Sequence, residues 1–398
     1  MDVCTWEEAR ERAASFRRRL EPVMAAPDEA VGSVLAVPLR ARADMPAYDT
    51  SQHDGWAVCG PGPWKIRKAS RRDLFAGLEY HEASTHRLLR DGQATPVMFG
   101  EPLGDGVTGV VAEGRARIDG DLLKLADTGR PSNYIEPGAG VRARGSDAGV
   151  GTELLPAGER VSPAVAALSA AAGHDAISII PMPVAGLIRV GNEIVDSGIP
   201  RSGFNRDSVS PALPGWVAGM RARVQPTRWV TAGDGELIDV IDDIISDIVV
   251  TAGPFSGAAV RRVLQGMRAD IVVDGVLVKP GSSMLLAQLQ DGRPLIHCGG
   301  APADAVATLV TLLAPIIAAL TGQPVPTERI RLDDAIPGDR LLTHLLPVRP
   351  TSGRGPGVSY IRTGGPGGLF ALSQATGLAV IPTVGVRLNE KVEVLELP

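Results

Sequence analysis

The chain has 398 residues, of which 44% are hydrophobic and 21% charged, and its net charge is −5. This balance is ordinary for a soluble globular protein, and it excludes a nonspecific nucleic-acid binder, which needs a surplus of basic residues. The 47 glycines and 32 prolines make up about a fifth of the chain, which predicts many turns but lies below the level typical of disordered low-complexity proteins.

The length predicts two to four domains. The three cysteines, Cys4, Cys59 and Cys298, are few, odd in number and widely spaced, which argues against a disulfide framework. A reducing, cytoplasmic environment is therefore expected. The first twenty residues carry mixed charges without the apolar core of a signal peptide, so no secretion signal is predicted there.

In chain order, the first predicted element is an amphipathic helix over 1–25, where apolar residues recur at helical spacing. Residues 46–140 differ, because short alternating runs between glycines and prolines predict a small β domain. A second helix is expected between 158 and 173. Ser162 is a suitable N-cap there, Pro163 suits the first helical position, and a glycine follows the end.

Residues 184–324 alternate strand and helix patterns, which predicts a doubly wound, mostly parallel sheet in an α/β multidomain protein. The expected strands are 184–190, 247–250, 270–273 and 294–297. The expected helices are 207–222, 235–246, 257–268 and 302–321. Residues 325–398 return to short apolar runs between glycines and predict a separate C-terminal β domain.

The uncharged stretch 305–320 needs to be distinguished from a membrane span. It is only about 16 residues long, which is short for a span, and it contains Thr308, Thr311 and Pro315. A helix buried against the sheet and ended by Gly322 is the favoured interpretation, so no membrane partner is predicted.

Two glycine-rich turns follow expected strands of the sheet, Gly253–Gly257 and Gly299-Gly300. Parallel sheets bind ligands at the carboxyl ends of their strands, and glycines let backbone N–H groups approach an anion there. Ser256 would add a hydroxyl donor, and Lys279 is a possible phosphate partner. Any α/β fold also needs tight turns, so the glycines of both loops could serve the turn alone and bind no ligand.

Three carboxylates beside glycines are the acidic candidates, Asp54, Asp147 and Glu193. Together they would suit a hard divalent cation, which prefers oxygen ligands. Aspartate beside glycine is also common turn chemistry, which is the alternative for each residue alone. His53 and His297 have no second ligand at metal spacing and are interpreted as structural.

Several of these segments resemble one family in a single co-linear order. PAYDTSQHDGWAV, which begins at Pro46, resembles "PPFDNSAMDGYAV" of the molybdopterin molybdenumtransferases, the family of the MoeA proteins and the gephyrin E domain. VRARGSDAG resembles "VRRRGEDIKKG", LIRVGNEI stands in the place of "VLSTGDEL", and VKPGSS in that of "MKPGKP". The resemblance covers nearly the whole chain.

The resemblance implies a four-part, elongated molecule. Residues 1–45 with 140–178 would form a discontinuous domain, and 46–139 the inserted β domain. Residues 179–324 would form a sheet domain like that of molybdopterin adenylyltransferase, and 325–398 a C-terminal β barrel. It also implies a homodimer whose cleft lies between the sheet domain of one subunit and the inserted region of the other.

The activity implied by the resemblance is insertion of molybdate into adenylylated molybdopterin, with release of AMP and the help of a divalent cation such as Mg²⁺. The residues that match the family motifs are Asp54, Asp147, Glu193, Lys279 and Asn205. Asp54 and Glu193 would hold the metal, and the lysine and the glycine loops would bind the molybdopterin phosphate or molybdate. Molybdopterin adenylyltransferase would be a possible protein partner.

The chain departs from the family pattern at several cleft positions, namely Phe99, Val190, Asn192, Ala258, Val260, Ser283, Gly299, Ala301 and Asp304. Asp304 is expected in the first turn of helix 302–321, where a carboxylate favours the helix but repels an anionic ligand. Two hypotheses follow. The chain is either an active molybdenumtransferase with a divergent cleft, or a weakened paralogue that binds a pterin, a nucleotide or a partner protein without turnover.

Overall fold

The computed structural model describes residues 3–16, 19–67, 88–126, 134–191, 194–202, 204–231, 233–253, 257–352, 355–362 and 368–397. The chain divides into two compact units. The first unit consists of residues 1–23, 32–34 and 180–398, and the second of residues 24–31 and 35–179. Each unit has its own sheets and its own hydrophobic clusters.

A seven-stranded sheet lies at the centre of the first unit, in the order β17-β14-β19-β23-β22-β20, with β18 also paired to β14. Its strands are β14 (Val184–Val190), β17 (Arg223–Val224), β18 (Arg228–Val230), β19 (Ile248–Ala252), β20 (Asp270–Asp274), β22 (Leu285–Gln288) and β23 (Pro294–Cys298). Strands β14, β17, β18, β19 and β23 pair in parallel. The pairs β20–β22 and β22–β23 are antiparallel, so the predicted mostly parallel sheet has an antiparallel edge.

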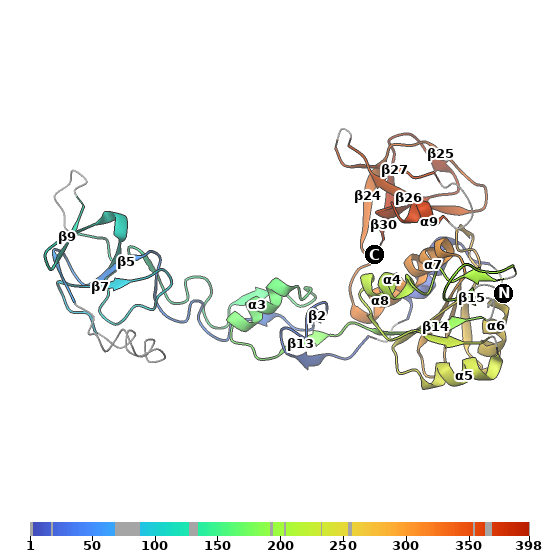
Figure 1. Cartoon of the computed structure of the whole chain (residues 1–398), viewed down its shortest axis with the longest axis horizontal. Helices are drawn as coiled ribbons and strands as arrows, with labels where there is room; N and C mark the ends of the chain where they lie inside the picture. Colours follow the sequence, from blue (N-terminus) through green and yellow to red (C-terminus); the bar gives the residue numbers. More distant parts are fainter. Residues whose placement is uncertain are drawn as a thin grey trace. The chain divides into compact units, whose positions relative to one another are not determined.

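Helices cover both faces of this sheet, as a doubly wound fold requires (Figure 1). On one face lie α4 (Leu213–Gly219), α7 (Pro302–Thr308) and α8 (Ala314–Thr321), packed on strand residues such as Leu187 and Val250. On the other face lie α5 (Asp234–Asp243) and α6 (Gly257–Gly266), packed on residues such as Ile188 and Val249. The near-continuous burial of β14 and β19 follows from this double cover.

The helical stretch Pro302–Thr321 is long and apolar enough to cross a membrane, but it is mostly buried within the first unit. A π-helical turn, Leu309–Leu313, joins α7 to α8, and Gly322 ends the stretch in the left-handed conformation. Its threonines are satisfied, since Thr308 Oγ1 donates to Asp304 O and Thr311 Oγ1 accepts from Trp6 Nε1 at 3.0 Å. The predicted buried helix is confirmed.

The N-terminal helix α1 (Trp6–Ala14) is shorter than the predicted 1–25. Thr5 begins it with a capping box to Glu8. Trp6, Ala9 and Ala13 join the hydrophobic cluster that contains α8. This helix therefore packs within the sheet unit, whereas the family resemblance implied a domain of residues 1–45 with 140–178. Amphipathic spacing predicts a buried face but not the surface that covers it.

The C-terminal part of the first unit contains five strands that close on themselves. They are β24 (Thr327–Leu332), β26 (Thr343–Pro350), β27 (Gly357–Tyr360), β28 (Gly377–Ile381) and β30 (Lys391–Glu396). The additional pairing between β26 and β28 closes the ring, which encloses its own cluster with Leu332, Val348 and Ala379. The predicted C-terminal barrel is present, and β21 (Val278–Lys279) adds to its edge at β26.

The second unit contains a six-stranded sheet in the order β8-β5-β7-β6-β10-β9. The strands are β5 (Gly55–Val58), β6 (Trp64–Ile66), β7 (Gln93–Val97), β8 (Gly109–Ala112), β9 (Ala116–Asp119) and β10 (Leu122–Leu125). Trp64 and Leu123 are fully buried in its core, with Val58 and Val111. The β character predicted for 46–140 is confirmed in the described part of this range.

Helix α3 (Pro163–Ala171) belongs to the same unit and begins as predicted, with Ser162 Oγ accepting from Val165 N at 3.2 Å. It packs through Ala166 in a separate cluster with Leu35, Leu39 and Ile177. Three short strands form a sheet in the order β1-β13-β2, namely β1 (Val23–Ala25), β13 (Ile177–Ile180) and β2 (Val34–Leu35).

Candidate functional site

The strand order of the sheet reverses between the neighbouring strands β14 and β19, because the connections that follow them lead to opposite sides of the sheet. From β14 the chain passes through α4 on one face to the outer strand β18, and from β19 it passes through α6 on the other face toward β20. Ligands of open α/β sheets bind in the crevice outside such a switch point, at the carboxyl ends of the strands. Gly191 and Gly253 follow these two strand ends directly. The candidate site is therefore centred on this edge.

The loop after β19 leads into α6 beside a buried histidine. A Cβ atom on Gly257 would lie 3.2 Å from Arg261 Nη1 and 3.7 Å from His297 Nε2, so a larger residue there would press on the end of the Arg261 side chain. His297 Nδ1 lies 3.0 Å from Thr251 Oγ1. Burial, and secondly the charge of Arg261, lowers the pKa of His297 to about 4. The imidazole is therefore neutral at pH 7 and structural, as predicted.

We expect this histidine to make stability pH-dependent. The unfolded imidazole takes up a proton near pH 6.5 and the folded one only near pH 4. The contribution of neutral His297 to the free energy of unfolding is therefore fully present above pH 6.5. It falls by about 3 kcal/mol as the pH drops to 4. Denaturant unfolding at both pH values should show this loss in the wild type and a smaller one in His297→Gln. Equal pH slopes in the two proteins would contradict it.

Lys279 is the last residue of β21; its side chain is exposed, and in the strand register it lies opposite His344 of β26. Two residues on, the backbone N–H of Gly281 donates to Asp304 Oδ1 at 2.8 Å. A Cβ atom on Gly299 would lie 3.4 Å from Asp304 Oδ2 and 3.6 Å from Ser283 Oγ. Asp304 thus lies in the first turn of α7, as predicted, and joins the Gly299-Gly300 turn to the loop that follows Lys279.

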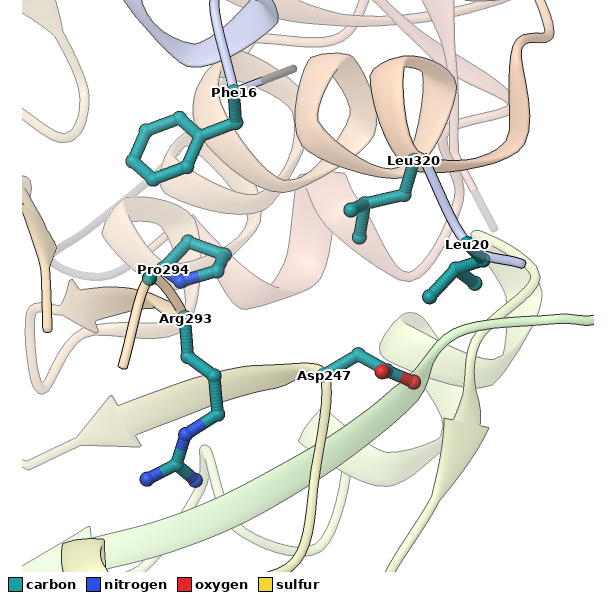
Figure 2. A pocket seen from close by; sticks show the side chains of 7 residues that line it. Phe16, Leu20, Asp247, Arg293, Pro294 and Leu320 are labelled. Atoms are coloured by element: carbon teal, nitrogen blue, oxygen red, sulfur yellow. The ribbon is translucent and has the colours of Figure 1, made fainter. Parts of the chain in front are cut away.

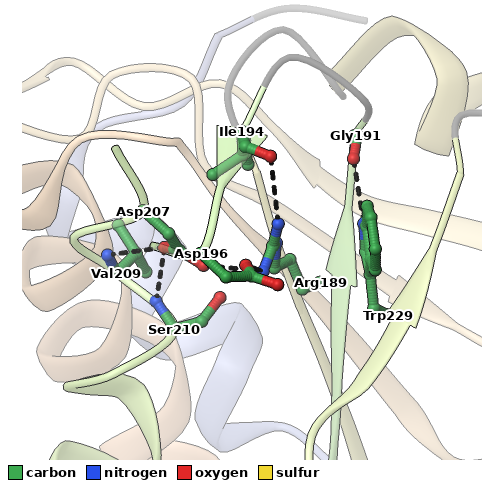
Figure 3. Close-up of polar contacts among 8 residues, drawn as sticks. All are labelled: Arg189, Gly191, Ile194, Asp196, Asp207, Val209, Ser210 and Trp229. Atoms are coloured by element: carbon green, nitrogen blue, oxygen red, sulfur yellow. Dashed lines mark hydrogen bonds and ion pairs between the residues drawn. The ribbon is translucent and has the colours of Figure 1, made fainter. Parts of the chain in front are cut away.

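A buried ion-pair cluster lies below the end of β14 (Figure 3). The Arg189 side chain is only 8% exposed, and its Nη1 lies 3.2 Å from Asp207 Oδ2, itself 7% exposed. Arg189 also pairs with the more exposed Asp196 and donates to Ile194 O. The second oxygen of Asp207 accepts from Val209 N and Ser210 N. Sequence analysis missed this cluster, because no motif marks a buried arginine whose partners are seven and eighteen residues away.

Asn205 lies in β16 (Asn205–Arg206), which pairs with β15 (Ile194–Val195), and its side chain is exposed. The register places Asn205 opposite Ile194. The Arg189 cluster holds both ends of this pair of strands, through Ile194 O on one side and Asp207 on the other. Glu193 and Ser256, two of the predicted site residues, lie outside the described residues, as does Phe255.

The turn that carries Asp54 belongs to the second unit, between β4 (Thr50–Ser51) and β5. Asp54 is exposed, and its Oδ1 accepts from Phe99 N at 2.8 Å. Its backbone oxygen accepts from Glu113 N at 3.0 Å. These bonds fix the turn between two neighbouring segments and present the carboxylate to solvent.

Gly55 explains why glycine follows Asp54. A Cβ atom there would lie 2.1 Å from Val111 O in the neighbouring strand. We expect Gly55→Ala to destabilise the protein by about 2–3 kcal/mol, because backbone atoms cannot move aside cheaply. Gly114→Ala, which meets nothing within 4 Å, is the matched control and should change stability by less than about 0.5 kcal/mol. Equal melting temperatures for the two variants would refute this.

Asp147 lies in the second unit as well, and its charge is already paired. Arg142 donates to both of its carboxylate oxygens, and Asp147 N donates to Met45 O at 2.9 Å. Arg142 is in β11 (Val141–Arg142), which pairs with β4. This pairing ties the segment of Asp147 to the strand that leads into the Asp54 turn.

Within the described residues, no three histidine, cysteine, aspartate or glutamate side chains lie close enough to hold a metal ion. Glu193 lies outside the described residues, so the divalent-cation site stays a prediction. A shallow hollow at the opposite, amino-terminal edge of the sheet is lined by Phe16, Leu20 and Leu320 (Figure 2). Its polar groups already bind the chain, since Asp247 accepts from Val184 N and Arg293 donates to Ile244 O. This hollow does not suit a polar ligand.

Comparison with known proteins finds similar sequences over most of the chain. The family model of the MoeA N-terminal region (domain I and II) matches residues 4–173. Molybdopterin molybdenumtransferase 2 of Mycobacterium tuberculosis (strain H37Rv) is 26% identical over 346 residues, covering 80% of each chain. Molybdopterin molybdenumtransferase of Staphylococcus aureus (strain MRSA252) is 22% identical over 326 residues, covering 79% of this chain and 75% of that protein.

Solved structures share the fold. The molybdopterin biosynthesis MoeA protein from Pyrococcus horikoshii OT3 covers 99% of each chain with a TM-score of 0.72 and 18% sequence identity. A molybdenum cofactor biosynthesis protein from Pyrococcus furiosus also covers 99% of each chain, with a TM-score of 0.58 and 14% identity. The multidomain architecture expected from the sequence is thus found in full-length structures.

Proposed function

We propose that this chain is a molybdopterin molybdenumtransferase of the MoeA family, which inserts molybdate into adenylylated molybdopterin and releases AMP. The observation that carries the proposal is the switch point of the first unit. Glycine turns follow the ends of β14, β19 and β23 there, and Lys279 precedes a loop bound to the start of α7. Backbone N–H groups and an ammonium group suit phosphate and oxyanion ligands.

The direct test is the reaction itself. Purified protein is incubated with adenylylated molybdopterin, molybdate and Mg²⁺, and AMP release is followed together with molybdenum bound in the cofactor. We expect both products to appear in equal amounts and to require molybdate. Ligand binding without AMP release would favour the weakened paralogue instead.

We further propose that Mg²⁺ is the divalent cation and that Asp54 and Glu193 are its carboxylate ligands. Carboxylate oxygens are suitable ligands for Mg²⁺. The proposal includes a homodimer, which the family resemblance implies, with the site completed by both subunits. The N-terminal helix, α3 and the sheet domain would form the dimer contact. A monomer by light scattering at micromolar concentration would contradict this arrangement.

We also propose a cytoplasmic location. Molybdopterin adenylyltransferase, which makes the adenylylated substrate, is proposed as a protein partner. Asp147, Asn205, Ser256 and the glycines of the loops (Gly253, Gly257, Gly299 and Gly300) are proposed to contribute to substrate binding. Of these, Asp147 is proposed to act through its ion pair with Arg142, since that pair already uses both carboxylate oxygens.

Asp304 is expected to oppose anion binding at this edge. A carboxylate 4 Å from a unit negative charge costs on the order of 4 kcal/mol at an effective dielectric near 20. We expect Asp304→Ser to bind molybdate or inorganic phosphate at least tenfold more tightly by calorimetry. The variant should also melt slightly lower, because it loses the bond to Gly281 N and the helix benefit. Equal or weaker anion binding would show that Asp304 does not control the site.

A further inference from the structure

Trp229 is unusual among the five tryptophans of the chain. The residue is 54% exposed, whereas Trp6 and Trp64 are buried and Trp56 and Trp216 are partly buried. It lies in β18, the edge strand, in register with Arg189 of β14. Single exposed aromatic side chains are common on protein surfaces, but this one is held in a fixed orientation by its contacts.

Two contacts fix the indole ring (Figure 3). Its Nε1 donates to Gly191 O at 3.0 Å. The guanidinium carbon of Arg189 lies 4.8 Å from the ring centroid, in a cation–π arrangement. Because the guanidinium covers one face of the ring, a planar ligand can stack only on the opposite face.

Arg189 cannot easily move away from the ring. Its side chain is 8% exposed, and Asp207 and Asp196 both pair with it. The ring is therefore backed by a cluster that is itself anchored in the sheet. Its orientation is already set before any ligand arrives, which reduces the entropy cost of binding.

The position of the ring relates it to the candidate site. Trp229 bonds to Gly191, the residue that follows β14 at the switch point. Arg206 of β16 is exposed, and it directly precedes Asp207, the buried partner of Arg189, so it adds positive charge to the segment that holds this cluster. An aromatic ring near basic side chains suits a ligand that combines a flat heterocycle with phosphate groups.

We propose that the open face of Trp229 stacks on a planar heteroaromatic ring of the substrate, with Arg189 as its rigid backing. The identity of the ligand rests on the proposed function, whose substrate contains two such rings, a pterin and an adenine. Stacking on an aromatic side chain is tolerant of ring type, so both rings share the required chemistry.

The experiment compares Trp229→Phe with Trp229→Leu in the full-length protein. Both variants lose the N–H donor to Gly191, and only phenylalanine keeps an aromatic face. AMP and pterin-6-carboxylate serve as separate probes in calorimetry. We expect Trp229→Leu to weaken one probe about tenfold and Trp229→Phe to weaken the same probe less than threefold, and the affected probe identifies the ring.

Fluorescence gives a second measurement. The stacked probe should quench tryptophan emission of the wild type with the same dissociation constant as calorimetry, and Trp229→Phe should lose that quenching. Trp216→Phe is the matched control, because Trp216 packs against the hydrophobic cluster of α4, and it should retain the quenching.

Equal affinities of the wild type, Trp229→Phe and Trp229→Leu for both probes would overturn the proposal. Equal losses in the two variants would also overturn it, because they would assign the effect to the lost bond to Gly191. These outcomes are separate from the proposed function. Molybdate insertion by the wild type with unchanged probe binding in the variants would reject only the stacking role. Probe binding that depends on Trp229 in a protein without AMP release would reject only the transferase activity.

Discussion

Asp54→Asn is expected to lower molybdate insertion at least 100-fold while leaving the melting temperature nearly unchanged. The asparagine oxygen can still accept from Phe99 N, so the turn keeps its hydrogen bond. The variant loses only the negative charge, which the proposed Mg²⁺ site needs beside a phosphoanhydride. AMP release measured against Mg²⁺ concentration should also show a higher metal requirement. The same result is expected for Glu193→Gln.

Asp49→Asn is a matched control for this experiment. Asp49 is also exposed, and its Oδ1 accepts one backbone N–H, that of Arg144, at 2.7 Å. We expect its activity to stay within about threefold of wild type. An Asp54→Asn variant with wild-type rate and wild-type Mg²⁺ dependence would remove Asp54 from the site.

Arg189→Met is expected to cost about 3–5 kcal/mol of unfolding free energy, the largest stability loss predicted for this protein. Methionine keeps much of the volume, but it leaves the Asp207 carboxylate buried without its cation. Removing one partner of a buried ion pair is strongly destabilising, because the other charge stays desolvated. Denaturant unfolding followed by circular dichroism measures the loss.

The double variant Arg189→Met with Asp207→Asn separates the ion pair from packing. The amide oxygen of asparagine can still accept from Val209 N and Ser210 N, and no buried charge remains. We expect the double variant to be more stable than Arg189→Met alone. Asp196→Asn, whose aspartate side chain is 60% exposed, should cost less than about 1 kcal/mol. Strictly additive losses in the double variant would contradict the argument.

Helix α4 shows how a side chain can shorten a predicted element. The pattern predicted a helix over 207–222, and the structure begins it only at Leu213. Asp207 is used instead in the buried pair with Arg189, and its other oxygen binds the turn at 209–210. The apolar periodicity of the helix could be seen in the sequence, but the competing bonds of Asp207 could not.

The motif residues were found in the sequence because their local geometry is demanding. Gly55 must be glycine, because a Cβ atom there would lie 2.1 Å from the carbonyl oxygen of Val111. A constraint of this kind requires one residue type at a fixed position, and a sequence motif can show it. No sequence motif marks Trp229 or Arg189. Their contact joins two strands that are forty residues apart, and neither residue is unusual in its own segment.

The sequence by itself therefore determined the order of the main elements, the buried helix 302–321, the mostly parallel sheet and the β character of the C-terminal part. These follow from periodicity, capping residues and turn glycines, which are local in the chain. Only the tertiary structure decided that α1 packs against α8, that Asp304 binds the loop after Lys279, and that Arg189 backs Trp229. Each of these depends on which surfaces meet after folding, and a local pattern specifies a surface without specifying its partner.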